Sequence, residues 1–252
     1  MTESVETQAH LPRNLGLELV RATEATALSA GRWMGLGRPA EADRISSQAM
    51  YATLNTINMA GVIVKGEEGK HPHTVLLTSQ RAVGTGKGAR VDILVDPVDG
   101  LTQLSKGYPG AISVAAIAPQ GSMWAPLPAI YMDKIIVGAE VAPYLVPECL
   151  DAPAAWTLAL VARAKGVKVS NLTVFLLDRP RHADLIAEIR HAGAHVMLRP
   201  DGDIAGALMV CTPRSSVDLL MGVGGITEGL LATCAVKALG GEMLGRLDPQ
   251  DE

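Results

Sequence analysis

The stretch Val91–Gly107 reads VDILVDPVDGLTQLSKG, and the interpretation of the whole chain starts from it. Its apolar, β-branched first half gives way to Asp96-Pro97-Val98-Asp99-Gly100, which is typical of a buried strand that ends in a turn. Pro97 stiffens such a turn, and Gly100 can adopt the positive φ that completes it. The two carboxylates can therefore face one point, where they repel each other unless a cation lies between them.

An acidic surface turn is the alternative, because Asp-Pro and Asp-Gly pairs are common in turns. The preceding strand is too apolar for the surface, which favours acids at the mouth of a crevice, the usual ligand position in α/β sheets. Other predicted strands also end in acids, since Glu67 follows 61–65, and Asp201 and Asp203 follow 196–198. Clustered carboxylates without His or Cys partners select the hard cations Mg²⁺ or Mn²⁺.

Further residues extend this pattern. Asp43 and Glu228 lie in the first turns of predicted helices, where acids are also common for structural reasons. Arg179 and Arg181 follow another predicted strand, and arginines suit a phosphate. Gly224-Gly225 precedes a helix, so it is either a phosphate seat or a plain strand–helix turn. Metal-assisted hydrolysis of a phosphate ester, with water as the attacking group, is the natural interpretation.

The composition limits the other possibilities. The chain has 252 residues, of which 48% are hydrophobic and 3% aromatic, with 26 glycines, and this mixture is typical of an aliphatic α/β protein. A formal net charge of −4 without a basic run argues against a nucleic-acid partner. The polar start lacks the order of a signal peptide, and no apolar run approaches the ~20 residues that span a bilayer. We expect a soluble cytoplasmic protein with no membrane partner, whose Cys149, Cys211 and Cys234 are reduced.

Hydrophobic periodicity predicts alternating strands and helices. The expected strands cover residues 61–65, 91–95, 111–118, 134–138, 171–177, 196–198 and 217–223. The expected helices cover 14–34, 41–59 and 154–165, a segment that ends near 191, one that follows 203, and one from about 226 to 239. The first helix is expected to be amphipathic through Leu15, Leu17, Leu19, Val20, Ala27 and Leu28. Residues 1–13 are interpreted as a flexible tail, His71 and His73 as surface residues, and the glycine loop 84–88 as a hairpin or connection rather than a P-loop.

The sequence resembles the class II fructose-1,6-bisphosphatases, the GlpX-type bacterial enzymes of the lithium-sensitive phosphatase superfamily. The resemblance extends from about Asn14 to Leu247 and rests on ten motifs in the same order. These motifs are Arg21-Ala22-Thr23-Glu24, Ala42-Asp43, Gly66-Glu67, Val83-Gly84-Thr85-Gly86, Asp96-Pro97-Val98-Asp99-Gly100, Tyr131-Met132-Asp133-Lys134, Arg179-Pro180-Arg181-His182, Pro200-Asp201-Gly202-Asp203, Gly224-Gly225 with Glu228-Gly229, and Gly245-Arg246-Leu247.

The resemblance implies a layered α/β/α/β/α sandwich of the sugar-phosphatase type and a homo-oligomer, either a dimer or a tetramer. It implies one phosphatase domain over 14–247, with a metal-binding lobe over about 14–150 and a substrate lobe over about 151–247. Asp43 and Glu67 match the ligands of one metal ion, while the ligands of the other match Asp96, Asp99 and Glu228. The catalytic positions match Asp96, Asp99, Glu67 and Thr102. The positions that hold the sugar phosphate match Asp99, Gly100, Leu101, Tyr131, Arg179, Pro180, Arg181, Asp201, Gly202, Asp203 and Gly225.

The chain departs from the family pattern at several points near this site. Asp99 stands where the family has Glu, and Leu101 stands where it has a Thr whose hydroxyl helps to activate water. Either Thr102 takes this role one place later, a different group serves, or turnover is impaired. The acidic stretch expected after Glu67 is replaced by Glu68-Gly69-Lys70-His71-Pro72-His73. Family members also continue for several tens of residues beyond Leu247, so a sheet edge or a cover of the site is expected to be missing.

Three hypotheses follow. The first is a metal-dependent phosphatase, with fructose 1,6-bisphosphate as the default substrate and fructose 6-phosphate as the product. The second is a catalytically weakened or inactive relative that binds sugar phosphates or another subunit. The third is a phosphatase for a different compound, such as sedoheptulose bisphosphate, an inositol phosphate or a nucleotide. All five expected metal-ligand positions are carboxylates, which favours catalysis over binding alone.

Overall fold

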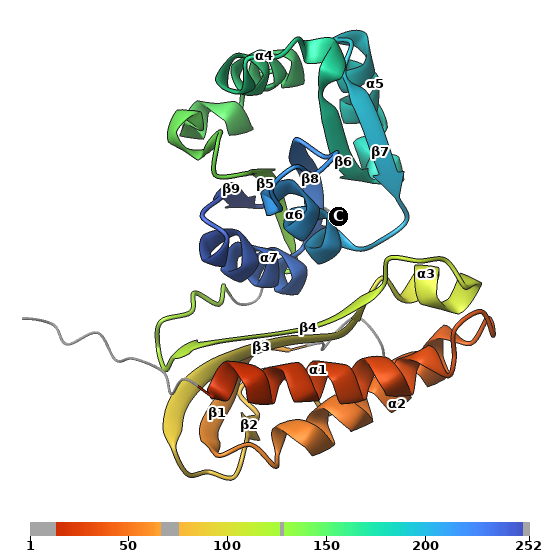
Figure 1. The fold of residues 1–252 in the computed structure, drawn as a ribbon, viewed down its shortest axis with the longest axis vertical. Coiled ribbons are helices and arrows are strands. Elements are labelled where there is room, and N and C mark those ends of the chain that lie inside the picture. Colours follow the sequence, from red (N-terminus) through yellow and green to blue (C-terminus); the bar gives the residue numbers. More distant parts are fainter. Residues whose placement is uncertain (1–13, 67–75, 127–128, 249–252) are drawn as a thin grey trace, which may run out of the picture.

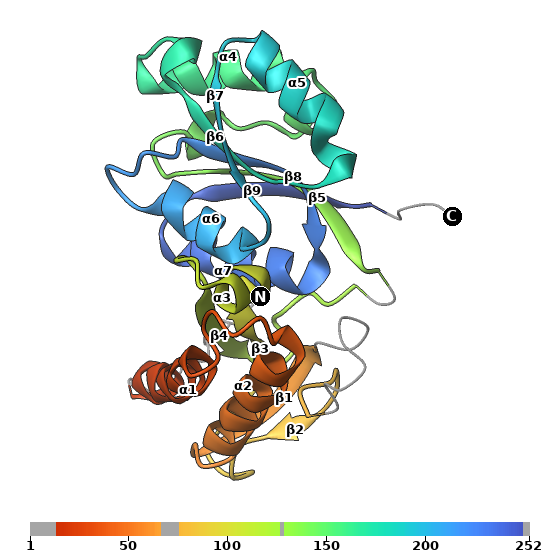
Figure 2. The same cartoon turned by 90° about the vertical axis from the view of Figure 1, so that its right-hand side faces the viewer.

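The computed structural model describes residues 14–66, 76–126 and 129–248. The described chain forms five layers, in the order helices, sheet, helices, sheet, helices (Figures 1 and 2). This mixed α/β arrangement confirms the predicted sandwich. Among the described residues, no helix combines the length and the apolar composition that crossing a bilayer requires.

The first sheet has the strand order β2-β1-β3-β4. Its strands are β1 (Met59–Lys65), β2 (Ala82–Val83), β3 (Ala89–Asp99) and β4 (Ile112–Pro119). β3 runs parallel to β1 and antiparallel to β4. The apolar run in β3 is buried on both faces, because Ile93 and Val95 pack towards α1 and α2, whereas Leu94 packs towards α7. This burial explains why the run shows no alternation with polar residues.

The second sheet has the strand order β7-β6-β8-β5-β9. Its strands are β5 (Tyr131–Val137), β6 (Thr173–Leu177), β7 (His195–Arg199), β8 (Leu219–Gly225) and β9 (Glu242–Leu247). β6 is parallel to both β7 and β8, whereas β5 is antiparallel to β8 and β9. The last strand of the first sheet ends at Pro119, and the first strand of the second sheet begins at Tyr131. The chain thus passes from one sheet to the other between these two residues.

The helices cover the sheets on both sides. They are α1 (Leu15–Gly31), α2 (Pro39–Leu54), α3 (Leu101–Lys106), α4 (Ala154–Lys165), α5 (Ala183–His191), α6 (Asp203–Cys211) and α7 (Ile226–Ala238). α1 and α2 cover the outer face of the first sheet, and α4 and α5 cover the outer face of the second. α6 and α7 lie between the sheets and share apolar clusters with both of them. The middle helices therefore connect the two sheets.

Several expectations about individual elements are wrong. In α1, Leu17, Val20 and Leu28 are 65%, 58% and 67% exposed, because the helix places Leu15 and Leu19 on its buried face instead. α2 ends at Leu54 rather than Met59, because Met59 already begins β1. α3 and β9 were not expected at all. α3 has only six residues, too few to show a helical hydrophobic period.

Candidate active site

Asp96 and Asp99 lie at the end of β3, and both are buried, with 5% and 4% exposure. The two acids are part of the strand rather than of a separate turn, because the pairing of β3 with β4 continues as far as Asp99, with a shift of register between Asp96 and Asp99. The Val98 N–H donates to Asp96 Oδ1 at 3.0 Å and stabilises this irregular segment. Gly100 follows with φ of +100°, as expected from the sequence.

Asp99 and Asp201 each accept hydrogen bonds from the first turn of a helix on the other side of the site. Asp99 Oδ2 accepts from the N–H groups of Ile204 and Ala205, at 3.0 and 3.1 Å, at the start of α6. Asp201, two residues before the start of α6, accepts from the Thr102 N–H in α3 at 2.7 Å through its Oδ2. We call this reciprocal pair the crossed caps. Each carboxylate satisfies helix N–H groups that have no partner within their own helix and faces the positive end of the helix dipole.

Gln103 strengthens the crossed caps. Its Nε2 donates to the main-chain oxygen of Asp201 at 2.9 Å and to Asp201 Oδ1 at 3.0 Å. The Gln103 side chain is only 2% exposed and passes close to Gly100, Gly110 and Gly202, where any larger residue would crowd it. The loop before α6 is thus fixed to α3, and the acids of both sheets meet at one place.

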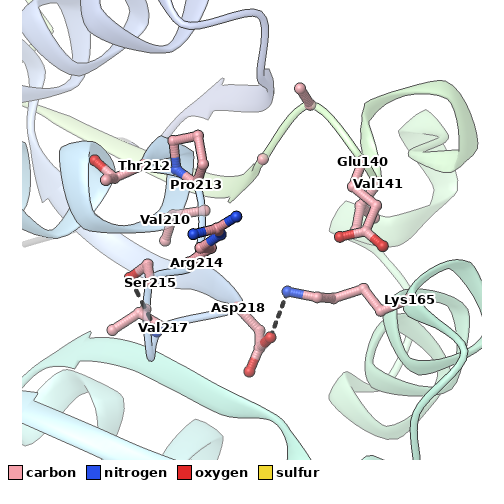
Figure 3. Close-up of a pocket in the computed structure, with 12 residues that line it drawn as sticks. Glu140, Val141, Lys165, Val210, Thr212, Pro213, Arg214, Ser215, Val217 and Asp218 are labelled. Carbon is pink, nitrogen blue, oxygen red and sulfur yellow. Dashed lines mark hydrogen bonds and ion pairs between the residues drawn. The ribbon is translucent and has the colours of Figure 1, made fainter.

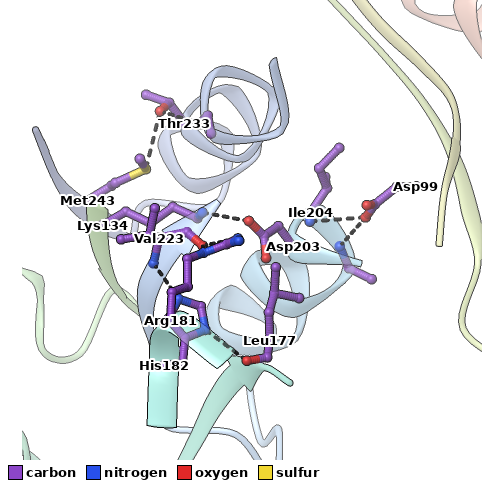
Figure 4. A network of polar contacts seen from close by, with 12 residues as sticks. Asp99, Lys134, Leu177, Arg181, His182, Asp203, Ile204, Val223, Thr233 and Met243 are labelled. Carbon is purple, nitrogen blue, oxygen red and sulfur yellow. Dashed lines mark hydrogen bonds and ion pairs between the residues drawn. The ribbon is translucent and has the colours of Figure 1, made fainter. Parts of the chain in front are cut away.

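Asp203 makes a buried ion pair with Lys134. The Lys134 Nζ and Asp203 Oδ2 atoms are 2.6 Å apart, and the two side chains are 1% and 5% exposed (Figure 4). Lys134 comes from the middle of β5, whereas Asp203 is the first residue of α6. Gly224 in β8 leaves the necessary space, since a Cβ atom there would overlap with both charged groups. Gly224 thus makes room for a buried ion pair, a role that the sequence did not suggest for it.

His182 occupies a space that a second glycine of β8, Gly222, leaves open. It lies against Gly222, where a Cβ atom would come within 2.9 Å of the His182 Nε2 atom. His182 Nε2 accepts from the Val223 N–H at 2.9 Å, so the ring carries its proton on Nδ1, which donates to the Leu177 main-chain oxygen at 2.8 Å. Burial lowers the pKa of His182, and the charge of Arg181 lowers it further. The neutral imidazole therefore connects β6 to β8 through these two hydrogen bonds.

Arg181 and Tyr131, two predicted substrate-binding residues, are neighbours. The Arg181 guanidinium lies over the Tyr131 ring, 5.3 Å from its centre. Its Nε and Nη2 atoms donate to the Val223 main-chain oxygen at 3.1 and 2.8 Å. Arg179 and Pro180 lie beside them on the exposed turn that precedes α5. A positive group is thus held at the exposed end of β8, close to Gly225.

The structure also locates the other predicted ligands. Glu228 lies in the first turn of α7, and Gly225 leaves room for its carboxylate. The neighbouring Thr227 hydroxyl donates to the Gly66 main-chain oxygen at 3.3 Å, which connects α7 to the end of β1. Asp43 is buried on α2, but Glu41 is the acid of the first turn, because the helix begins at Pro39. Asp43 therefore does not have the helix-end role that we considered for it.

Glu67, Leu101 and Thr102 are the remaining predicted residues of the site. Glu67 and the segment from Glu68 to His73 lie outside the described residues. Leu101 is half-buried and packs against a small apolar cluster of Ala30, Ala42 and Leu104, where α1 ends and α2 begins. Thr102 is half-buried in the first turn of α3, where its N–H is held by Asp201.

The carboxylates around Asp99 create an excess of negative charge. Burial raises the pKa of Asp99 well above its usual range, and the charges of Asp96, Asp203 and Glu228 raise it further, against the N–H of Ala205, which lowers it. A divalent cation would relieve this repulsion, so the donor set fits a hard metal ion. Among the described residues, however, no group of three His, Cys, Asp or Glu side chains forms a ready-made metal site.

A separate cavity of about 440 Å³ lies at the other end of the second sheet, where α6 ends and β8 begins (Figure 3). Lys165 Nζ and Asp218 Oδ1 are 2.5 Å apart in its wall. Asp218 Oδ2 also accepts from the Thr173 N–H at 2.7 Å, so this ion pair joins α4 to β6 and β8. We interpret it as a structural contact, remote from the carboxylates.

Comparison with known proteins gives a consistent result. The family model described as bacterial fructose-1,6-bisphosphatase, glpX-encoded, matches residues 13–252 of the chain. The chain is 40% identical over 240 residues to a class 2 fructose-1,6-bisphosphatase of Haemophilus influenzae, which covers 95% of this chain and 71% of that protein. It is 40% identical over 235 residues to fructose-1,6-bisphosphatase 1 class 2 of Escherichia coli K12, which covers 93% of this chain and 68% of that protein.

Proposed function

Because this chain belongs to the glpX-encoded family of bacterial fructose-1,6-bisphosphatases, which are metal-dependent phosphoric monoester hydrolases, we propose that it hydrolyses fructose 1,6-bisphosphate to fructose 6-phosphate. The observation that carries this proposal is the concentration of buried negative charge at Asp99, to which Asp96, Asp203 and Glu228 contribute. Such a set needs a cation, and a cation at this place suits a phosphate ester.

We propose Mg²⁺ or Mn²⁺ as the metal, because the candidate ligands are all carboxylates. Asp96, Asp99 and Glu228 would hold one ion, and Asp43 and Glu67 the other. When bound, the ions supply Lewis acidity for the phosphoryl oxygens and a water of lowered pKa. Asp99 would bind the metal ion while its Oδ2 atom keeps the hydrogen bonds from the N–H groups of α6.

The chain's own residues would orient the substrate. Arg179 and Arg181 offer guanidinium groups for a phosphate, together with Tyr131 and the main chain at Gly225. Carboxylate oxygens of the Asp201–Asp203 segment would accept hydrogen bonds from sugar hydroxyls. Gly100 and Leu101 would complete this wall of the site through their main chain.

Thr102 is our candidate for the group that orients the attacking water, with Asp96, Asp99 and Glu67 as the neighbouring catalytic carboxylates. Leu101 cannot act in this way, because its side chain has no hydrogen-bonding group and packs against the apolar cluster of Ala30, Ala42 and Leu104. The Thr102 main chain is fixed by Asp201, which accepts a hydrogen bond from its N–H group. If Thr102 does not serve, the protein would be a weakened catalyst or a binder of sugar phosphates.

The test is phosphate release with Mn²⁺ or Mg²⁺ from a panel of sugar monophosphates and bisphosphates. We expect release from fructose 1,6-bisphosphate that the Asp96→Asn variant loses. Asp184→Asn, on the exposed surface of α5, is the matched control and should keep full activity. Release from another panel member alone would reassign the substrate. No release from any member, with metal still bound, would favour the non-catalytic alternative.

We also propose a homo-oligomer, either a dimer or a tetramer, and a cytoplasmic location. The family resemblance supports the first, and the three free cysteines are compatible with the second. Sedimentation velocity of the purified protein tests the oligomeric state directly.

A further inference from the structure

The Lys134–Asp203 ion pair is an unusual feature of the second sheet. Lys134 is followed in β5 by the buried residues Ile135, Ile136 and Val137, and its side chain is 1% exposed. Taking an ammonium group out of water is costly, and a buried ion pair is often no more stabilising than apolar residues of the same volume. Fold stability alone is therefore a weak explanation for a lysine at this position.

The position of Asp203 suggests what the lysine does. Asp203 begins α6, and the next two N–H groups of that helix hold Asp99. Lys134 thus fixes the first residue of the helix that joins the two sheets at the candidate site. Only one of the two carboxylate oxygens of Asp203, Oδ2, accepts a hydrogen bond from a described residue (Figure 4).

We propose that Lys134 is a positioning residue, whose ammonium group holds the Asp203 carboxylate by its Oδ2 atom and turns it so that its Oδ1 accepts a hydrogen bond from a sugar hydroxyl of the substrate. The inference rests on the proposed function, because it concerns how the sugar is held. A carboxylate oxygen accepts hydrogen bonds, which matches the hydroxyl donors of a sugar. Lys134 already occupies Oδ2, so the carboxylate cannot rotate freely.

This proposal predicts an effect that depends on the substrate. A sugar phosphate uses Asp203, whereas a small aryl phosphate such as p-nitrophenyl phosphate has no sugar hydroxyl to offer. Loss of the lysine should therefore raise KM for fructose 1,6-bisphosphate and leave the turnover of the aryl phosphate almost unchanged. A purely structural role would weaken the hydrolysis of both substrates together.

The central variants are Lys134→Met, Asp203→Asn and the double variant. The double variant removes both charges and leaves no unpaired buried ion, so it is the one most certain to fold. We expect each of the three to raise KM for fructose 1,6-bisphosphate about 10- to 100-fold, the size expected for a hydrogen bond to a charged group. The double variant should be no worse than the single variants, because Lys134 acts through Asp203.

Two further variants complete the experiment. Lys134→Arg retains the charge and should recover part of the lost affinity. Lys165→Met breaks a less buried ion pair between the end of α4 and the residue before β8, remote from the carboxylates, and should leave KM unchanged. Thermal unfolding of every variant checks that the fold is intact.

The outcomes separate this inference from the proposed function. Unchanged KM in the double variant, or an equal loss with the aryl phosphate, would overturn the role of Lys134 while the proposed function stands. If wild-type protein releases no phosphate, calorimetric binding of fructose 1,6-bisphosphate replaces the kinetics. Binding by wild type that weakens in Lys134→Met would then support the inference without turnover, and no binding by wild type would overturn both.

Discussion

The two sheets supply carboxylates to the same place in different ways. The first sheet supplies Asp96 and Asp99 from the end of a buried strand, and Asp99 is stabilised by peptide N–H groups of α6. The second sheet supplies Asp203 from the start of a helix, together with its own counter-ion, Lys134. A peptide dipole compensates a charge less completely than an ammonium group does. We therefore expect Asp96 and Asp99 to need a metal ion and Asp203 to need none.

The strongest test of this difference is metal binding. Mn²⁺ at about 100 times its Kd should stabilise the wild-type protein by about 2.7 kcal/mol through mass action. Asp96→Asn should lose nearly all of this stabilisation, whereas Asp203→Asn should keep most of it. Thermal unfolding with and without Mn²⁺, after treatment with a chelator, measures both effects. Equal losses in the two variants would show that metal binding depends on Asp203 as much as on Asp96, which would contradict this difference.

The next test fills the space beside the ion pair. Gly224→Ala places a Cβ atom where Lys134 and Asp203 meet, so the pair must separate. Overpacking of this kind typically costs about 1–3 kcal/mol, and we expect a loss near the upper end because a charged pair is disrupted. Denaturant unfolding measures the change. Gly16→Ala in α1, where a Cβ atom meets nothing within 4 Å, is the control and should not destabilise the protein.

A smaller effect is expected at the crossed caps. Gln103→Leu keeps the volume of the side chain but removes both hydrogen bonds to Asp201, so we expect a loss of about 1–2 kcal/mol in the free energy of unfolding. Gln48→Leu on the exposed surface of α2 is the matched change and should alter stability by less than about 0.5 kcal/mol. If the two variants behave alike in denaturant unfolding, Gln103 does not hold the sheets together.

The smallest effect concerns pH and the neutral His182. Its pKa in the folded protein is lowered by burial, so the unfolded chain binds a proton first as the pH falls below the ordinary value of 6.5. The contribution of His182 is therefore fully present above pH 6.5 and is lost as the pH falls towards the lowered pKa. His182→Gln should show a weaker decline of stability over this range. His191→Gln, at an exposed position, should follow the wild-type curve in the same pH series.

Much of the fold could be predicted from the sequence, because long apolar runs and helical periods are local signals. The strand that leads to Asp96, the helix at 154–165 and the helix after Gly225 are where they were expected. The face of α1 was predicted wrongly, since Leu17 and Val20 fit the same period as the buried Leu15 and Leu19. Periodicity alone does not distinguish two apolar stripes on one helix.

The contacts that build the site could not be predicted in the same way. Thr102 and Asp201 are 99 positions apart in the chain, and no local pattern connects them. The sequence holds one signal for Lys134, which is a charged residue directly before the apolar run Ile135–Val137, and this could have indicated a buried partner. Gly224 was interpreted only as a turn or phosphate-binding residue, and Gly222 only as part of a strand. The space that a glycine leaves for a neighbour cannot be recognised until the neighbour is known.

The crossed caps also have a consequence for folding kinetics. Their hydrogen bonds join residues about 100 positions apart, so neither α3 nor α6 gains its cap until the two halves of the chain have met. Closing such a long loop costs entropy before any contact repays it, and such contacts form late. We expect a refolding chain to regain most of its helical circular dichroism before it regains the ability to bind metal. The active centre would thus be a property of the finished fold and absent from any partly folded intermediate.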